Sequence, residues 1–231
     1  MHDKNSTSTT KSQDQATRHA PRATDPIDFF LYLITDRTQV AKGQTLYTAV
    51  EAALQGGVKA VQLREKDLSA DELMPLAKRL RALTTSHDAR LFINDNLDIA
   101  VKVKADGVHL GEHSLSTAAA RQRLGADYLI GVSTHSKRET LIAAEQGADF
   151  VTFGPVYATP SKAAYGPPQG LAALAEVCGA SRLPVFALGG ITPEKVVDVY
   201  AAGASGIALI SAIIAHPAPR TAAQAFMQSH P

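Results

Sequence analysis

The sequence predicts a single closed (β/α)8 TIM barrel, because three patterns recur along its 231 residues. Short apolar runs alternate with longer Ala- and Leu-rich segments of helical period. Eight such pairs follow one another, which is the number found in a (β/α)8 barrel. Three helical segments end in a glycine phrase that leads directly into the next apolar run, at Gly56–Ala60, Gln146–Phe150 and Ala202–Gly206. The alternative, an open doubly wound sheet, would carry a glycine fingerprint after its first strand, where this chain has Thr35-Asp36-Arg37.

The predicted strands are apolar runs bounded by turn-forming residues. They show little alternation, as expected where a parallel sheet is buried on both faces. In order, they are Phe29–Thr35, Ala60–Leu63, Leu91–Ile93, Gly107–Leu110, Leu129–Val132, Phe150–Phe153, Val185–Leu188 and Gly206–Ile210.

The predicted helices lie between these strands, and two of them carry clear start signals. Ser69 precedes a segment with Glu72 at its third position, which is the spacing of a capping box. Thr192 is followed by Pro193, a residue favoured at the first helical position. The helices are expected at Leu46–Gln55, Ala70–Thr85, Leu97–Lys102, Ser116–Leu124, Lys137–Glu145, Gln169–Val177, Pro193–Ala201 and Arg220–Gln228.

Residues 1–26 differ in composition from the rest of the chain. Ser, Thr, Lys, Gln and Asp dominate, with almost no large apolar side chains. Such a segment buries too little surface to offset its conformational entropy, so we expect a disordered polar tail. It also lacks the apolar middle of a secretory signal. We therefore expect residues 27–231 to form one catalytic barrel domain.

Composition excludes several classes of protein. The net charge is +1, so no strong attraction to nucleic acid or to an acidic membrane is expected. The one cysteine, Cys178, excludes an internal disulfide and fits a reducing compartment. No apolar stretch approaches the ~20 residues that span a bilayer. We expect a cytoplasmic protein, and a homodimer by analogy alone.

The first candidate site follows the second predicted strand, at Gln62, Arg64 and Lys66. Alternate residues of a strand face the same way, so these three side chains share one side. Arginine provides a bidentate fork for phosphate oxygens and lysine a mobile positive charge. A solvated loop with random charges would not explain the period-two spacing beside a buried run.

A second polar pair, Asn94 and Asp95, follows the third predicted strand. A carboxylate near phosphate-binding cations suits Mg²⁺, which takes one or two carboxylates and completes its shell with substrate oxygens. Asn94 is suited to hydrogen-bonding a heterocycle. The alternative is an ordinary turn, because Asn-Asp-Asn is also good turn chemistry.

Later loops offer further candidates. Thr159, Pro160, Ser161 and Lys162 lie in the longest predicted loop, after the sixth strand, and long loops often bind ligands. After strands seven and eight come Gly189-Gly190 and Ile210-Ser211, where such barrels often bind phosphate through backbone N–H groups.

The histidines are ambiguous candidates. His109 lies within the fourth predicted strand, where a histidine is more often a buried, hydrogen-bonded core side chain than a catalytic base. His135 follows the fifth strand, at the end where chemistry is expected.

Seven phrases together resemble the thiamine-phosphate synthase family, in matching order from about Leu31 to Ile214. They are Gln62–Lys66, Asn94-Asp95, Gly107–Gly111, Gly131–His135, Thr159–Lys162, Gly189–Ile191 and Ile210-Ser211. The resemblance implies condensation of an aminopyrimidine methyl pyrophosphate with a thiazole phosphate, giving thiamine phosphate and pyrophosphate in a Mg²⁺-assisted dissociative substitution.

The resemblance also implies roles for individual residues. Arg64, Lys66, Ser133 and Lys162 are implied as catalytic, and Asp95 as a ligand of Mg²⁺. The pyrimidine pyrophosphate is held by the stretch Gln62-Leu63-Arg64-Glu65-Lys66 and by Asn94, with Ser133 and Lys162 at the pyrimidine or the leaving group. Thr159, Pro160, Ser161, Gly190, Ile210 and Ser211 cradle the thiazole phosphate.

One departure from the family pattern concerns the metal. Ser114 stands where the family usually has a second Mg²⁺-binding Asp, in Gly111-Glu112-His113-Ser114-Leu115. Glu112 is a candidate replacement, directly or through water, and substrate phosphates are another. Two alternative functions stay open: a thiazole tautomerase that moves a proton on the thiazole carboxylate phosphate with His135 as acid and base, and a non-catalytic phosphate-binding paralogue.

Overall fold

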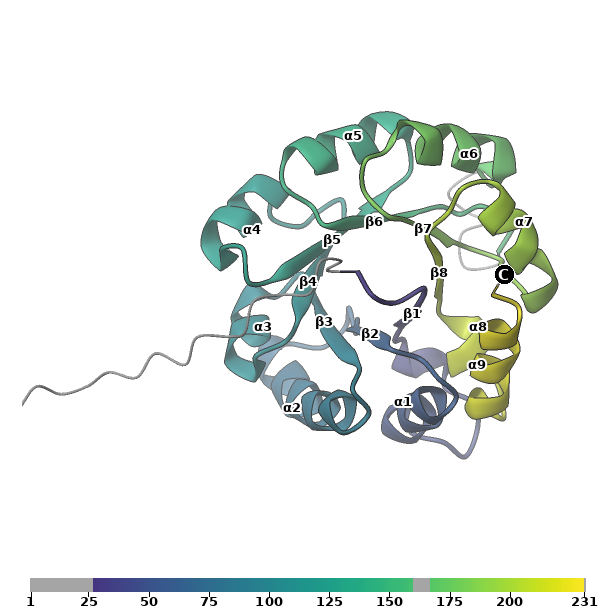
Figure 1. Ribbon diagram of the computed structural model, residues 1–231. Helices are drawn as coiled ribbons and strands as arrows, with labels where there is room; N and C mark the ends of the chain where they lie inside the picture. The colour runs from purple at the N-terminus through teal and green to yellow at the C-terminus, as the bar shows by residue number, and fades with distance from the viewer. Residues whose placement is uncertain (1–26, 160–166, 231) are drawn as a thin grey trace, which may run out of the picture.

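The protein is a closed barrel of eight parallel strands in a computed structural model that describes residues 27–159 and 167–230. The strands follow one another in chain order, and β8 pairs with β1 to close the ring. Figure 1 shows this ring with the helices outside it. The predicted (β/α)8 barrel is confirmed. The polar tail predicted at 1–26 lies outside the described residues.

The elements alternate as predicted. The strands are β1 Leu31–Ile34, β2 Ala60–Leu63, β3 Arg90–Asn94, β4 Gly107–Leu110, β5 Leu129–Thr134, β6 Phe150–Phe153, β7 Val185–Leu188 and β8 Gly206–Leu209. The helices are η1 Arg37–Gln39, α1 Leu46–Gln55, α2 Ala70–Ser86, α3 Leu97–Val103, α4 Thr117–Leu124, α5 Lys137–Glu145, α6 Gly170–Ala180, η3 Pro193–Lys195, α7 Val196–Ala201, α8 Ser211–Ile214 and α9 Pro219–Gln228.

Two helix starts show where local signals act. The Ser69 capping box is present, with the Ser69 hydroxyl accepting from the Glu72 N–H and the Glu72 carboxylate accepting from the Ser69 N–H. Thr192 stands at the N-cap position, as predicted, but its side chain makes no capping hydrogen bond. Pro193 does stand at the first position, but its helix begins as the 3₁₀ turn η3 before α7. Such turns are common at helix starts.

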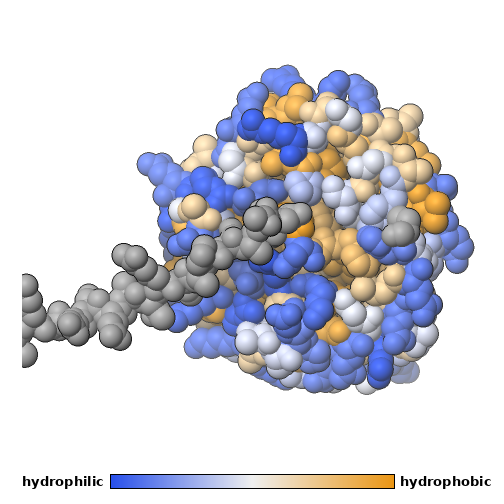
Figure 2. Space-filling view, viewed as in Figure 1, coloured by the Kyte–Doolittle hydropathy of each residue, from blue (hydrophilic) through white to orange (hydrophobic). Residues whose placement is uncertain are grey.

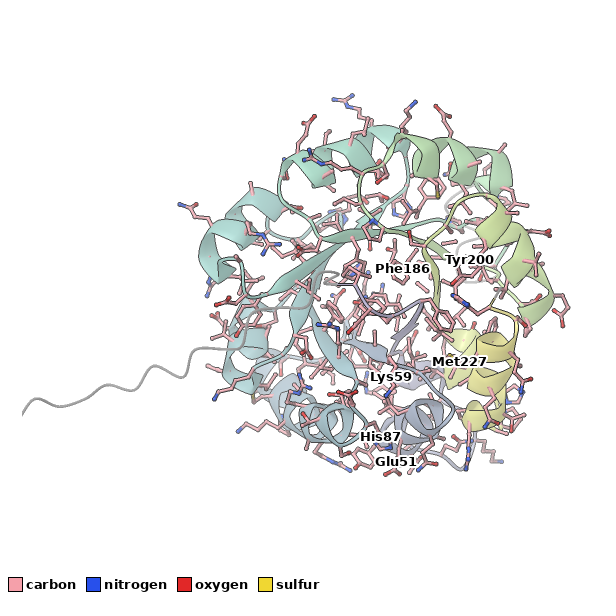
Figure 3. All side chains as sticks on the ribbon, viewed as in Figure 1. Glu51, Lys59, His87, Phe186, Tyr200 and Met227 are labelled. Atoms are coloured by element: carbon pink, nitrogen blue, oxygen red, sulfur yellow. The ribbon has the colours of Figure 1, made fainter. Side chains whose placement is uncertain are left out.

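Aromatic rings fill the barrel interior toward the amino ends of the strands. Phe29, Tyr32, Phe92, Phe150 and Phe186 are buried together. Tyr32 and Phe92 meet edge to face with centroids 5.2 Å apart, and Phe150 and Phe186 lie 5.5 Å apart. Phe186 points into the ring in Figure 3, and the purple segment leading into β1 lies across the ring in Figure 1. This packing leaves the other end of the barrel for a site.

A second core lies between the strands and the helices, and strand alternation separates the two. Along β1, Leu31 and Leu33 belong to this outer core, whereas Tyr32 and Ile34 belong to the interior. Figure 2 shows hydrophilic side chains over much of the helical rim. Within the described ranges, no helix is both long and apolar enough to cross a bilayer.

Candidate active site

A cavity of about 660 Å³ opens at the carboxyl ends of the strands. Its lining gathers side chains that are far apart in the sequence. Those singled out by the sequence that line it are Gln62, Arg64, Lys66, Asn94, Asp95, Ser114, Ser133, Thr159, Gly190, Ile210 and Ser211. Glu112, His109 and His135 line it as well.

Some predicted site residues do not line this cavity. Leu63 is fully buried in the outer core, because it alternates with Gln62 on β2. Glu65 is also buried and faces away from the cavity. Pro160, Ser161 and Lys162 lie outside the described residues.

Glu65 anchors the loop that carries Arg64 and Lys66. Its carboxylate accepts 2.6 Å from the Thr35 hydroxyl and 2.9 Å from the backbone N–H of Arg37. The Thr35 hydroxyl oxygen in turn accepts from the backbone N–H of Arg64 at 2.9 Å. The buried carboxylate thus ties the β1 and β2 loops together. Arg64 and Lys66, on either side of Glu65, line the cavity.

The end of β3 presents an exposed carboxylate. Asp95 adopts a left-handed backbone conformation, with φ of 59°, and its N–H donates to the carbonyl of His109. Asn94 Nδ2 donates to Asp95 Oδ2 at 2.7 Å. Hydrogen bonds therefore fix the orientation of the Asn94 and Asp95 side chains at one polar corner of the cavity, which an ordinary turn would not require.

Ser114 completes this corner by hydrogen bonding. Its hydroxyl accepts from the backbone N–H of Gly111 at 2.6 Å and donates to Asp95 Oδ1. Where a second carboxylate would repel Asp95, the serine hydroxyl holds it. Among residues 27–159 and 167–230, no three His, Cys, Asp or Glu side chains converge as a ready metal-binding cluster.

A buried chain of hydrogen bonds runs through the barrel to Ser133. Gln62 Nε2 donates to the Tyr32 hydroxyl at 3.2 Å, which lies 3.4 Å from His109 Nδ1. His109 Nε2 lies 3.0 Å from the Ser133 hydroxyl. If each group donates a hydrogen bond to the next, Tyr32 donates to His109 Nδ1. His109 then carries its hydrogen on Nε2 and donates it to the Ser133 hydroxyl oxygen. The Ser133 hydroxyl hydrogen is then left for an acceptor in the cavity.

Burial keeps this chain neutral. It lowers the pKa of His109 to about 3, with a smaller contribution from the charge of Arg64. Burial also raises the pKa of Tyr32 well above its usual range. Gly131 makes room for His109, because a Cβ there would lie 2.6 Å from His109 Nδ1. His109 is therefore the core residue that the sequence indicated, and it also contacts Ser133.

His135 occupies an exposed position on the cavity wall. Its Nδ1 lies 2.5 Å from the carbonyl oxygen of Gly154. A carbonyl only accepts, so Nδ1 carries a hydrogen and Nε2 is the basic nitrogen of the neutral ring.

The rim after β7 brings a residue that sequence reasoning missed. Lys195 lines the cavity, and its Nζ donates to the Gly190 carbonyl at 3.0 Å. Gly190 has φ of 63°, and a Cβ there would lie 2.5 Å from the Ala158 carbonyl oxygen. The signal in the sequence was a lysine only five residues after the glycine pair.

The fold and the cavity define a (β/α)8-barrel enzyme with its site at the carboxyl ends of the strands. A family model described as thiamine monophosphate synthase matches residues 31–213, and the chain belongs to this family.

Individual relatives agree with this assignment. A Geobacter sulfurreducens protein that is provisionally named a thiamine-phosphate synthase is 56% identical over 87% of this chain and 94% of its own length. The thiamine-phosphate synthase of Methanospirillum hungatei is 42% identical over 87% of this chain and 97% of its own. The solved thiamine phosphate pyrophosphorylase of Pyrococcus furiosus superposes with a TM-score of 0.79 at 33% identity, covering 89% of this chain and 96% of that one.

Proposed function

We propose that this protein is a thiamine-phosphate synthase that joins a pyrimidine methyl pyrophosphate to a thiazole phosphate. One observation carries the proposal beyond family membership: Arg64 and Lys66 line one cavity together with Asn94 and Asp95. Cations and a carboxylate at one mouth suit a pyrophosphate accompanied by a hard metal ion.

The reaction follows from charge. The bond between the pyrimidine methylene carbon and the pyrophosphate oxygen breaks, and both electrons leave with pyrophosphate. The thiazole nitrogen then donates its lone pair to the methylene cation and forms the new C–N bond. Arg64 and Lys66 stabilise the negative charge that grows on the leaving group. No general base is needed, and the remaining task is to align two substrates.

Other residues have supporting roles in this proposal. Gln62 and Asn94 orient the pyrimidine substrate, and Glu65 acts by anchoring the loop between Arg64 and Lys66. The Ser133 hydroxyl donates to the pyrimidine or to the leaving group. Thr159, Gly190, Ile210 and Ser211 contact the thiazole phosphate. Lys162 keeps the leaving-group role that the resemblance implies, and Pro160 and Ser161 keep theirs at the thiazole phosphate.

The donor set fits Mg²⁺. Asp95 and Glu112 offer carboxylates on the cavity wall, and the Ser114 hydroxyl orients the Asp95 carboxylate. A hard cation that shares few protein carboxylates with substrate oxygens suits this arrangement. When bound, it would neutralise pyrophosphate charge.

The test is to incubate the purified protein with both substrates and Mg²⁺ and to measure thiamine phosphate, with an EDTA control. We expect Mg²⁺-dependent product, strongly reduced in Arg64→Ala. Arg123→Ala is a matched control, because Arg123 pairs with Asp98 on the surface of α4 and lines no part of this cavity. If the folded protein formed no thiamine phosphate from the two substrates with Mg²⁺, the proposal would be overturned.

The tautomerase alternative has one observation in its favour, the basic Nε2 of His135 at the cavity. Incubation with thiazole carboxylate phosphate alone would reveal it, and a His135→Gln variant would abolish that activity. For a non-catalytic binder, Mg²⁺ and pyrophosphate would bind without any product. The expected homodimer is tested by light scattering of the same preparation.

A further inference from the structure

The positive side chains of the cavity stand on two separate parts of its wall. Among the described lining residues, the lysines and arginines are Arg64, Lys66 and Lys195. Arg64 and Lys66 follow β2, whereas Lys195 ends η3 after β7, and β1 and β8 stand between these strands. The proposed reaction brings two anionic substrates into one cavity. The pair after β2 suits the pyrophosphate, which leaves the cation after β7 for the other anion.

Lys195 is held where two loops meet. Its Nζ donates to the Gly190 carbonyl at 3.0 Å and lies 4.4 Å from the centre of the Tyr157 ring. Tyr157 N–H donates to the Gly189 carbonyl at 3.0 Å, which joins the same two loops through the backbone. An ammonium group has three N–H donors. The carbonyl takes one and the ring face a second, so one donor is left for a ligand in the cavity.

A purely structural contact of the same kind exists elsewhere in the chain. Lys59 Nζ donates to the His87 carbonyl at 2.9 Å. Lys59 directly precedes β2, at the amino end of that strand, and does not line the cavity. Lys195 differs from Lys59 because it lines the cavity, as Gly190, Ile210 and Ser211 also do, and contacts Gly190.

We propose, resting on the synthase function, that Lys195 binds the phosphate of the thiazole substrate and selects the phosphorylated thiazole over its free alcohol. Backbone N–H groups hydrogen-bond either form, but a cation gains most from the phosphate charge. With the alcohol bound, the ammonium would lose water without gaining an anion, and a site left with an unpaired charge rejects that ligand. By holding the Gly190 carbonyl, the same ammonium also fixes the backbone of the phosphate site.

The experiment compares Lys195→Met, Lys195→Arg and Lys59→Met with the parent protein. For Lys195→Met we expect the KM for thiazole phosphate to rise about 10-fold to 100-fold, the size of a lost charged hydrogen bond. The KM for the pyrimidine pyrophosphate should stay within about 2-fold, since that substrate uses the β2 cations. Lys195→Arg should recover most of the loss, and Lys59→Met should show none.

A second measurement separates charge recognition from displacement of Gly190. Calorimetric binding of thiazole phosphate and of the thiazole alcohol should show that Lys195→Met weakens only the phosphorylated ligand. Equal weakening of both, or an unchanged KM for thiazole phosphate, would overturn the role of Lys195. Absence of product from the parent protein would overturn the synthase function instead, so the two failures are distinguishable.

Discussion

The hydroxyl of Thr35 donates a 2.6 Å hydrogen bond to Oε1 of Glu65, and both side chains are buried. Thr35 immediately follows β1, and Glu65 lies between the two cations after β2. One buried pair therefore links the loop after β1 to the loop that carries Arg64 and Lys66, the residues proposed to bind pyrophosphate.

Thr35→Val keeps the shape of the side chain but removes this donor and the acceptor of the Arg64 N–H. Because the Glu65 carboxylate would be buried with one donor fewer, we expect a loss of about 1–3 kcal/mol in the free energy of unfolding. The KM for the pyrimidine pyrophosphate should also rise. Denaturant unfolding and steady-state kinetics measure the two effects.

Asp67→Asn is the control for Thr35→Val. Asp67 pairs with Arg37 on the same loops, but it is exposed. Solvent screens such pairs, so little change in stability is expected. Equal losses in the two variants would show that burial of Glu65 is not what holds the loop.

His109 should give the protein a distinct pH dependence. Its pKa is lowered to about 3 in the folded chain from an ordinary 6.5. Between these values the unfolded chain binds the extra proton, so stability is lost as the pH falls below 6.5 toward 3. The slope from this one group is up to about 1.4 kcal/mol per pH unit.

Denaturant unfolding at several pH values would measure this slope in the parent and in His109→Gln. The variant should lose that part of the slope, whereas His216→Gln, at an exposed position, should keep it. A His109→Gln protein with the parent slope would contradict a neutral, buried His109.

Ser114 should control the metal requirement of the reaction. Ser114→Asp places a second carboxylate beside Asp95, so the Mg²⁺ concentration for half-maximal activity should fall by roughly tenfold. Without Mg²⁺ the two carboxylates should repel and lower the melting temperature. An Mg²⁺ titration and a melting curve with and without Mg²⁺ test both effects.

Glu112→Gln separates the two ways to replace the missing family carboxylate. If Glu112 supplies it, this variant should raise the Mg²⁺ requirement, and if substrate phosphates do, it should not. A Ser114→Asp variant with an unchanged titration would place Ser114 outside the metal site.

Gly190→Ala should damage the rim after β7. The new Cβ would lie 2.5 Å from the Ala158 carbonyl oxygen and 2.9 Å from Tyr157 Cβ, at φ of 63°. Gly43→Ala is the control, because Gly43 also has a positive φ, 87°, with nothing within 4 Å of an added Cβ. Thermal unfolding should show a loss in Gly190→Ala about 1–3 kcal/mol larger than in Gly43→Ala. Equal losses would mean that the two loops are not tightly packed.

The order of strands and helices could be predicted because each depends on residues that are close in the sequence. The Ser69 capping box and the glycine phrases act over a few residues. The side on which Gln62, Arg64 and Lys66 lie also followed from strand alternation alone.

Membership of a sequence motif did not reveal which contacts each side chain makes. Glu65 belongs to the same motif as Arg64, yet its carboxylate is buried against Thr35, 30 residues earlier, and does not line the cavity. Ser114 stands at the family's metal-ligand position, but its sequence position gave no sign that its hydroxyl donates to the carboxylate of Asp95, 19 residues away.

Periodicity and local motifs were enough to predict the barrel, the family and most of the polar side chains that line its cavity. The contacts between loops follow only from the three-dimensional fold: the hydrogen bonds from Gln62 through Tyr32 and His109 to Ser133, and the place of Lys195 beside Gly190. Those contacts join residues from different strands and loops. They depend on how barrel closure sets the distances between neighbouring strands, which no local pattern records.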